Sequence, residues 1–306
     1  MNRPPEILAL VNQKGGCGKT TTAVNLAGAL VDRGQRVLLV DLDPQAHATM
    51  ALGQCPDIGL TLAEVLGDEL PAAAVTIKVP GGLDLLPASE ALSEFEVAAE
   101  LRIHPEQLLH RALSPLASTY DTIVIDCPPR ADGILCANAL RSCTTALLVI
   151  ETGAFALQGA LKALDVLAAA ASAQDHGFRM RAVATLFDRR TRFARELLVA
   201  LQARFGPTLF DTVIRTSVRL REAAAHGLPI QLHAPASRAA GDFTALATEV
   251  MALGADDIDS ALREALGSSA QIQVPVQATG TSAQFAEDVI PPVPSTSSPA
   301  NQEGIL

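Results

Sequence analysis

Short apolar runs alternate along the chain with amphipathic stretches of helical length, and this alternation limits the possible folds more than any other feature of the sequence. The runs are rich in Val, Ile and Leu and have the length of buried strands, whereas the stretches between them repeat apolar residues at helical spacing. Such alternation predicts an α/β fold, with a mostly parallel twisted sheet and helices on both faces. The expected strands are Ile7–Val11, Arg36–Val40, Thr122–Ile125, Ala146–Ile150 and Arg181–Leu186, and the expected helices are Thr20–Asp32, Glu90–Leu101, Pro105–Leu116, Leu157–Ala173, Arg192–Arg204, Ser237–Leu253 and Asp256–Leu266.

A segment rich in glycine and lysine, N-Q-K-G-G-C-G-K-T-T-T, occupies positions 12–22, between the first expected strand and the first expected helix. Its three glycines allow the backbone to turn tightly, so that N–H groups can point at phosphate oxygens, and the helix N-terminus adds its dipole. Lys19 is placed to neutralise the β- and γ-phosphates, and the Thr20 hydroxyl is placed to bind Mg²⁺. The segment therefore predicts a P-loop NTPase rather than a merely glycine-rich turn.

Aspartates end two of the expected strands. Asp41 and Asp43 lie on one side of the chain where the second strand ends, because side chains alternate along a strand. Carboxylates beside Mg²⁺ and the γ-phosphate are what phosphoryl transfer to water needs. Asp126 ends an apolar strand in the Walker B form, which predicts that it holds Mg²⁺ through water.

The phosphate segment departs from the usual P-loop pattern. Gln13 stands where the first glycine is expected, and a second lysine, Lys14, follows it. This K-G-G-x-G-K-T form resembles the deviant Walker A box of the ParA/MinD family. Further segments over roughly residues 6–253 resemble the ParA branch in the same order: L-P-A-S at 86–89, N-A-L at 138–140, F-A-L-Q-G at 155–159, F-D-R-R-T at 187–191 and V-R-L-R-E-A at 218–223.

The resemblance implies roles for single residues. Lys14 would reach across a dimer interface to the nucleotide of the partner, Asp43 would position the attacking water, and Asp41 would support the site. The implied catalytic residues are Lys14, Lys19 and Asp43; the implied nucleotide contacts are Lys14, Gly15, Gly16, Cys17, Gly18, Lys19, Thr20, Thr21 and Asp41; the implied metal contacts are Thr20 and, through water, Asp126.

The resemblance also implies a function, with ATP and Mg²⁺ as cofactors. An ATP-bound sandwich homodimer would bind double-stranded DNA without sequence preference, and a ParB-like or other adaptor protein would stimulate hydrolysis. The cycle would position chromosome or plasmid DNA, or another cargo. Three segments differ from the family pattern: P-Q-A-H at 44–47, P-P-R-A-D-G at 128–133 and R-T-S at 215–217. The resemblance places the last two at the dimer, partner or base-binding surfaces, and these two leave the activating partner open.

The distribution of charge supplies a separate argument about DNA. The formal net charge is −10, but residues 179–238 hold eleven arginines against four acids. Contacts to a phosphate backbone need cations but no base-reading groups. The chain has no Trp and a single Tyr, which argues against a protein that binds single-stranded nucleic acid by stacking aromatic side chains on the bases. The alternative is a solvated, salt-bridged helix face. The candidate DNA-binding residues are Arg189, Arg190, Arg192, Arg195, Arg219, Arg221 and Arg238.

Two other functions stay open at this point. A MinD-like organiser would need a basic amphipathic helix at its end to lie on anionic lipid. Residues 239–266, however, hold one cation against six acids, and residues 267–306 hold no Lys or Arg. A P-loop metabolic ligase or an iron–sulfur reductase shares the same core. For a reductase, the spacing of Cys127 and Cys136 does not match the cluster-binding pattern.

The domain organisation follows from composition. Residues 1–266 are expected to form the P-loop ATPase domain, and residues 267–306, rich in Ser, Thr, Pro and Gln, a disordered tail in which Ile272–Val276 and Phe285–Ile290 are short apolar islands. The five cysteines show no C-x-x-C spacing, which favours a reducing compartment. With no apolar run of 18 residues, we expect a cytoplasmic protein without a membrane partner. Association with the nucleoid is what the family resemblance implies.

Overall fold

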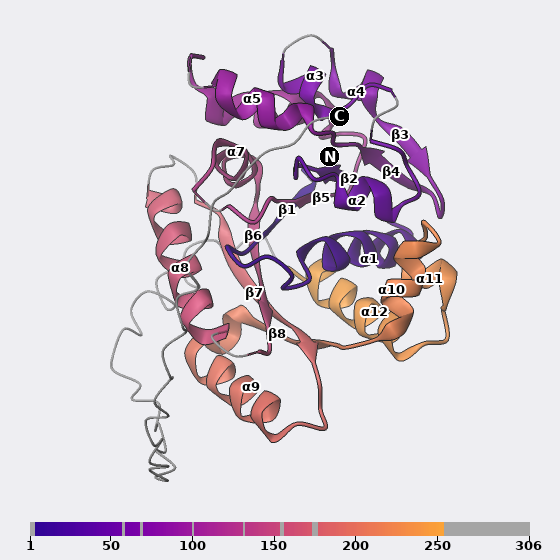
Figure 1. The fold of residues 1–306 in the computed structure, drawn as a ribbon, viewed down its shortest axis with the longest axis vertical. Coiled ribbons are helices and arrows are strands. Elements are labelled where there is room, and N and C mark those ends of the chain that lie inside the picture. Colours follow the sequence, from indigo (N-terminus) through magenta and orange to yellow (C-terminus); the bar gives the residue numbers. More distant parts are fainter. Residues whose placement is uncertain are drawn as a thin grey trace, which may run out of the picture. The chain divides into compact units, whose positions relative to one another are not determined.

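An eight-stranded sheet forms the centre of the computed structural model, which describes residues 4–56, 59–67, 70–99, 101–130, 132–153, 156–172 and 177–253 (Figure 1). The strand order is β3-β4-β2-β5-β1-β6-β7-β8; β3 pairs antiparallel with β4, and the other neighbours pair in parallel. The strands are β1 (Glu6–Val11), β2 (Val37–Asp41), β3 (Ile77–Val79), β4 (Leu83–Leu86), β5 (Thr122–Asp126), β6 (Thr145–Glu151), β7 (Arg179–Phe187) and β8 (Leu209–Arg215).

The mostly parallel sheet expected from the sequence is confirmed, and its five expected strands are present as β1, β2, β5, β6 and β7. Three further strands were not expected. β3 has three residues and β4 has four, too short for a clear pattern, and β8 is an edge strand with an exposed polar residue, Asp211. β7 begins two residues early, at Arg179, whose buried guanidinium pairs with Glu6 at 2.6 Å.

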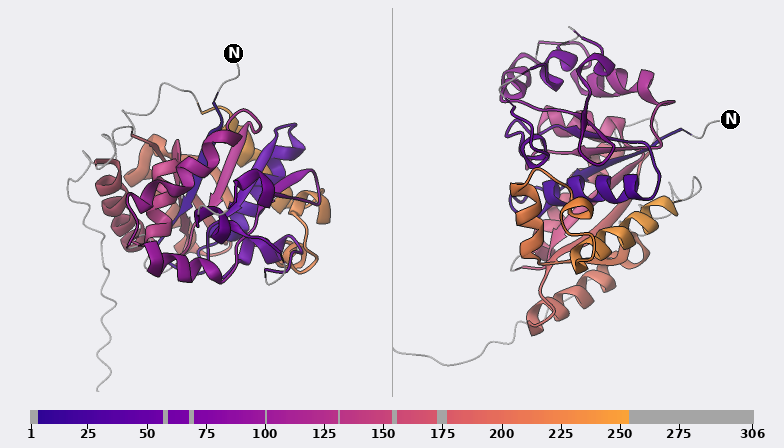
Figure 2. Two further views of the ribbon diagram at one scale, coloured as in Figure 1. Left: turned by 90° about the horizontal axis from the view of Figure 1, so that it is seen from above. Right: turned by 90° about the vertical axis from the view of Figure 1, so that its right-hand side faces the viewer.

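Helices cover both faces of the sheet (Figure 2). Alternate residues of each strand face opposite layers: Leu8 and Leu10 of β1 pack with α1 and α12, whereas Ala9 and Val11 belong to the core on the other face. The helices are α1 (Lys19–Asp32), α2 (His47–Ala51), α3 (Leu62–Leu66), α4 (Ala72–Val75), α5 (Ala91–Ala99), α6 (Leu108–Leu113), α7 (Ile134–Ser142), α8 (Ala156–Ser172), α9 (Arg192–Phe205), α10 (Val218–Ala225), α11 (Ile230–His233) and α12 (Arg238–Met251).

Five expected helices are present as α1, α5, α8, α9 and α12, and the other helices differ from the expectation. The helix expected over 105–116 is broken into a 3₁₀ turn, α6 and a second 3₁₀ turn, because Pro115 interrupts it. The short helices α2, α3, α4, α7, α10 and α11 were not expected. The helix expected over 256–266 and the tail over 267–306 lie outside the described residues.

Strand register brings the chemically distinct residues of the sequence together. β1, β2 and β5 are neighbours, and Asp41 at the end of β2 is the register partner of Asp126 at the end of β5. Leu10 of β1, just before the phosphate loop, is also a partner of Asp126. The loop after β1 and both aspartates therefore lie together at the carboxyl ends of the central strands.

The core between α12 and the sheet provides the first prediction. Phe243 of α12 is fully buried. We expect Phe243→Ala to lower the free energy of unfolding by about 3–5 kcal/mol, because it leaves a cavity in a packed layer. Phe193→Ala, at a side chain that is 54% exposed, is the matched control and should stay within about 0.5 kcal/mol of the wild type in urea denaturation. Equal losses in both variants would contradict this assignment of the core.

Candidate nucleotide site

The loop between β1 and α1 is shaped by glycines and by side-chain anchors. Gly16 and Gly18 have φ of 76° and 93°, the left-handed region that favours glycine, and Gly18 is the residue that precedes α1. Asn12 Nδ2 donates to the carbonyl of Val149 at 2.6 Å, and Thr185 Oγ1 donates to the carbonyl of Cys17 at 2.7 Å. The loop is thus fixed to β6 and β7, with its backbone at the N-terminus of a 14-residue helix.

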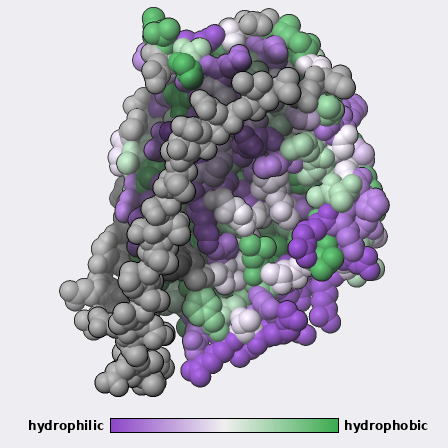
Figure 3. All heavy atoms as spheres, viewed as in Figure 1, coloured by the Kyte–Doolittle hydropathy of each residue, from purple (hydrophilic) through white to green (hydrophobic). Residues whose placement is uncertain are grey.

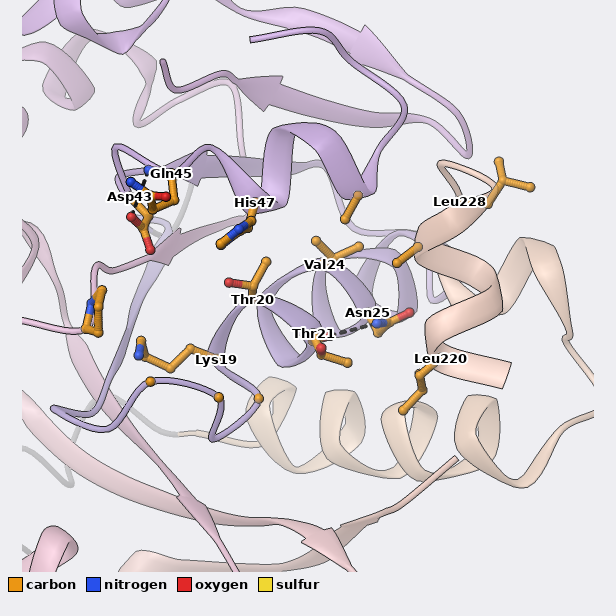
Figure 4. A pocket seen from close by; sticks show the side chains of 16 residues that line it. Lys19, Thr20, Thr21, Val24, Asn25, Asp43, Gln45, His47, Leu220 and Leu228 are labelled. Carbon is orange, nitrogen blue, oxygen red and sulfur yellow. Dashed lines mark hydrogen bonds between the residues drawn. The ribbon is translucent and has the colours of Figure 1, made fainter. Parts of the chain in front are cut away.

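Cys17 was one of the expected nucleotide contacts. Its side chain is fully buried, so it can contact a nucleotide only through its backbone. Lys19 is 7% exposed, and its Nζ donates to the carbonyl oxygens of Asn12 at 3.2 Å and Lys14 at 3.4 Å. The ammonium is therefore held over the loop. Thr20 and Thr21, on the first turn of α1, face the same space as Lys19 (Figure 4).

A cavity of about 480 Å³ opens beside this loop. Asp43 lies at its phosphate-loop end with Lys19 and Thr20, and its Oδ1 accepts a hydrogen bond from the backbone N–H of Gln45 at 3.0 Å (Figure 4). The cavity is lined by Gly15, Gly16, Gly18, Lys19, Thr20, Thr21, Val24, Asn25, Asp43, Gln45, His47, Ala51, Pro129, Leu220, Ala224 and Leu228. Most of the nucleotide contacts expected from the sequence therefore meet in one place.

Asp41 supports the site without lining the cavity. It is fully buried, and its Oδ2 accepts hydrogen bonds from the backbone N–H of Thr49 at 2.8 Å and from the Thr49 hydroxyl at 2.7 Å. Its Oδ1 accepts from the backbone N–H of Asp43 at 3.2 Å. Burial raises the pKa of the Asp41 carboxyl to about 6, although these hydrogen bonds act to lower it. Asp41 thus fixes both Asp43 and α2.

Asp126 is fully buried but, unlike Asp41, has no hydrogen-bond partner on either carboxylate oxygen among the residues that the structure describes. Burial raises its pKa well above the ordinary value, the charge of Asp41 adds to the shift, and the neighbouring Thr20 and Lys19 oppose it. An unpaired buried carboxylate close to the Thr20 hydroxyl fits Mg²⁺ held through water, with phosphate oxygens as the main ligands. Among the described residues, no three His, Cys, Asp or Glu side chains are grouped as ready metal ligands.

A second cavity, of about 530 Å³, shares Gly18, Thr21, Leu220 and Ala224 with the first. Its wall carries hydroxyl groups, guanidinium groups and apolar side chains, a combination that suits the ribose and base of a nucleotide whose phosphates lie on the loop. Apart from Gly18 and Thr21, none of these residues was a nucleotide contact expected from the sequence. R-T-S at 215–217, however, belongs to a segment that the family resemblance placed at the dimer, partner or base-binding surfaces. The additional lining residues are Thr22, Thr185, Leu186, Arg190, Ile214, Arg215, Thr216, Ser217, Val218 and Arg221.

Lys14 has a partner that the sequence had not indicated. Its side chain is 46% exposed and forms an ion pair with Glu151, the last residue of β6. The loop geometry thus leaves Lys14 on the surface, whereas Lys19 is buried, so the two lysines of the segment are placed for different tasks.

The seven candidate DNA-binding arginines are all exposed and lie on three elements. Four lie at the start of α9 or just before it, where Figure 3 shows hydrophilic side chains along the lower edge of the molecule, two lie on α10, and Arg238 begins α12. Surface ion pairs join three of the seven to acids: Arg190 to Asp188, Arg192 to Glu196 and Arg219 to Glu222.

Other arginines of the 179–238 stretch are structural, because Arg179 is buried with Glu6 and Arg215 binds Asp242 of α12. The solvated, salt-bridged alternative therefore describes part of this stretch. In the part of the chain that the structure describes, no helix combines the length and apolar character needed to cross a membrane.

Comparison with known proteins gives consistent results. A family model described as an AAA domain matches residues 5–178. The sporulation initiation inhibitor protein Soj of Bacillus subtilis is 36% identical over 255 residues, which cover 81% of this chain and 99% of the relative. The chromosome partitioning protein ParA of Caulobacter vibrioides is 34% identical over 258 residues, with 81% of this chain and 94% of the relative covered.

A solved structure described as cobyrinic acid a,c-diamide synthase of Mycobacterium smegmatis, with bound ATP analogue and magnesium, is also similar. It is 29% identical, has a TM-score of 0.72, and covers 81% of this chain and 94% of its own. ATP and Mg²⁺ are therefore ligands of a similar structure, and the site described above has the residues to hold both.

The unpaired carboxylate at the end of β5 leads to the second prediction. Asp126→Asn should raise the free energy of unfolding without ligands by about 1–2 kcal/mol, because it removes a buried charge with no partner. The added stability that Mg²⁺ confers in the presence of ATP should be lost. Asp121→Asn, just before the other end of β5, removes the exposed partner of Arg36 and should cost at most about 1 kcal/mol. Chemical denaturation with and without Mg²⁺-ATP measures both; a destabilised Asp126→Asn would contradict the prediction.

Proposed function

The chain belongs to the Soj/ParA family of partitioning ATPases, and from this premise we propose that it hydrolyses ATP with Mg²⁺ as a sandwich homodimer that binds double-stranded DNA without sequence preference. A ParB-like or other adaptor protein stimulates the hydrolysis. Segregation or positioning of chromosome or plasmid DNA is the proposed outcome, with the nucleoid as the place of action.

One observation carries the proposed chemistry: the meeting of Lys19, Thr20 and Asp43 at one end of a cavity whose neighbouring strand ends in the unpaired Asp126. Lys19 neutralises charge on the transferred phosphoryl group, and the loop N–H groups bind its oxygens. Mg²⁺, held by Thr20 and through water by Asp126, would neutralise further phosphate charge. Asp43 accepts a hydrogen bond from the attacking water and orients it.

The exposed Lys14 supports the sandwich dimer. The Lys14 ammonium is itself 46% exposed and is paired with a single carboxylate, that of the largely buried Glu151. It can exchange this partner for the more highly charged phosphates of a nucleotide on a second copy. Closure of the dimer would then depend on bound ATP, because only ATP offers that charge. Opening would follow hydrolysis and phosphate release.

The exposed arginines at the start of α9 and on α10 support DNA binding, since they are long cations and contacts to a phosphate backbone need no base-reading groups. A MinD-like membrane organiser is less well supported, because residues 239–266 are acidic. A metabolic ligase is the remaining alternative, but identity to the two partitioning relatives, 36% and 34%, exceeds the 29% to the diamide synthase.

Asp43→Ala tests the hydrolytic step. We expect ATP affinity to stay within about threefold of the wild type and the rate of phosphate release to fall by about 10²-fold or more, because the attacking water loses its acceptor. The variant should therefore accumulate as an ATP-bound dimer on DNA, measured by size-exclusion chromatography and filter binding. Asp211→Ala, at an exposed aspartate of β8, is the control. Normal hydrolysis by Asp43→Ala would refute the assigned role.

A double substitution, Arg195→Ala with Arg219→Ala, tests the DNA surface. The ATP-dependent affinity for duplex DNA should fall equally for unrelated sequences, and the slope of log K against log salt should shrink by about two, one for each lost phosphate contact. Arg36→Ala is the control, an exposed arginine paired with Asp121 on another part of the chain. Anionic vesicles serve as a competing ligand: ATP-dependent binding to vesicles but not to DNA would favour the MinD-like alternative.

A further inference from the structure

The turn between α10 and α11, residues 227–230, is held on both sides by contacts that leave no room for a side chain. Gly227 has φ of +68°, and a Cβ there would lie 2.8 Å from Cα and 2.9 Å from N of Gly53, the glycine that follows α2. Gly53 also has positive φ, at +74°. Two backbones therefore touch directly, one from the α2 segment and one from the α10 segment.

The other side of the same turn is held by α1. A Cβ at Gly28 would lie 2.6 Å from Cβ of Pro229, and Asn25 Oδ1 accepts a hydrogen bond from the backbone N–H of Ile230 at 2.7 Å. Asn25 Nδ2 donates in turn to the carbonyl of Thr21 at 2.7 Å. The turn is thus packed between the phosphate-loop helix and the end of α2, with little freedom to shift independently of either.

Both packed elements lead into the nucleotide site. α2 is preceded by Asp43 and is fixed to Asp41 through Thr49. α10 contributes Leu220 and Ala224 to the walls of both cavities, and between them it bears Arg221, which lines the second cavity. Figure 4 shows α2 and α10 on two sides of the cavity above α1, with His47 on α2 and Leu220 on α10.

α10 also carries surface charge that faces away from the cavities. Arg219 is exposed and pairs with Glu222 at 2.8 Å, on the same helix whose inner side lines the nucleotide site. A displacement of the helix therefore moves a cavity wall and an arginine of the proposed DNA surface together, because a helix of eight residues moves as one body.

We propose that the turn at 227–230 mechanically links the Asp43–α2 segment to α10, with Gly227 as the positioning residue that fixes their separation. Nucleotide bound against Asp43 and α1 then sets the position of α10 and of its arginines. The expected effect on DNA binding rests on the proposed function. The link itself is a property of the nucleotide site and can be measured without DNA.

Amide hydrogen exchange of α10, with and without a non-hydrolysable ATP analogue and Mg²⁺, tests the link. In the wild type the analogue should slow exchange in α10 by about fivefold or more, as expected for a helix whose packing ligand binding stabilises. In Gly227→Ala this slowing should be lost, while the affinity for a fluorescent ATP analogue stays within about threefold. Gly34→Ala, at a glycine of φ +85° with nothing within 4 Å of its Cβ position, controls for backbone strain and should behave as the wild type.

The outcomes separate the link from the proposed function. Full nucleotide-dependent slowing in a folded Gly227→Ala overturns the link, and so does a wild-type α10 that does not respond to nucleotide, a result that needs no variant to fold. A wild-type α10 that responds, in a protein that binds no DNA in any nucleotide state, supports the link and overturns the DNA-binding function. Loss of ATP-dependent DNA affinity in Gly227→Ala, but not in Gly34→Ala, supports both.

Discussion

A fully buried carboxylate with no hydrogen-bond partner, that of Asp126, is the constraint around which the site is built. Leaving such a group in the interior costs free energy that the rest of the fold must offset. The parallel register of β1, β2 and β5 places it below the phosphate loop and opposite Asp41, where the dipole of α1 and the ammonium of Lys19 reduce that cost. The same placement provides an acceptor for a hydrated metal ion.

Asp41 and Asp126 have different environments, and these give them different roles. Asp41 receives three hydrogen bonds and thereby fixes Thr49 and Asp43, so it determines where the α2 segment lies. Asp126 receives none from the protein and is left to a ligand. The segment that follows α2 contacts Gly227, just after α10, so the arrangement fixed at the strand ends also positions α10.

Much of this arrangement could be predicted from the sequence, because it depends on local patterns. Apolar runs marked the central strands, and the glycine–lysine segment marked Lys19 and Thr20 with their strand-to-helix context. Glu151 and the Gly53–Gly227 contact could not be predicted, since they join positions far apart in the chain through packing alone. The short strands β3 and β4 were missed because three or four residues do not establish a period.

The net charge of −10 does not describe the local distribution of charge in this protein. The arginines of residues 179–238 differ in environment. Arg179 and Arg215 bind acids within the fold, Arg215 also lines the second cavity together with the exposed Arg190 and Arg221, and the remaining candidates are exposed. Because the arginines that line the second cavity and the other exposed candidates share α10 and the start of α9, cations at the candidate nucleotide site and cations of the proposed DNA surface are held on the same elements. Occupation of one place can therefore alter the field at the other within a Debye length, about 8 Å at physiological salt, without any contact between the two ligands.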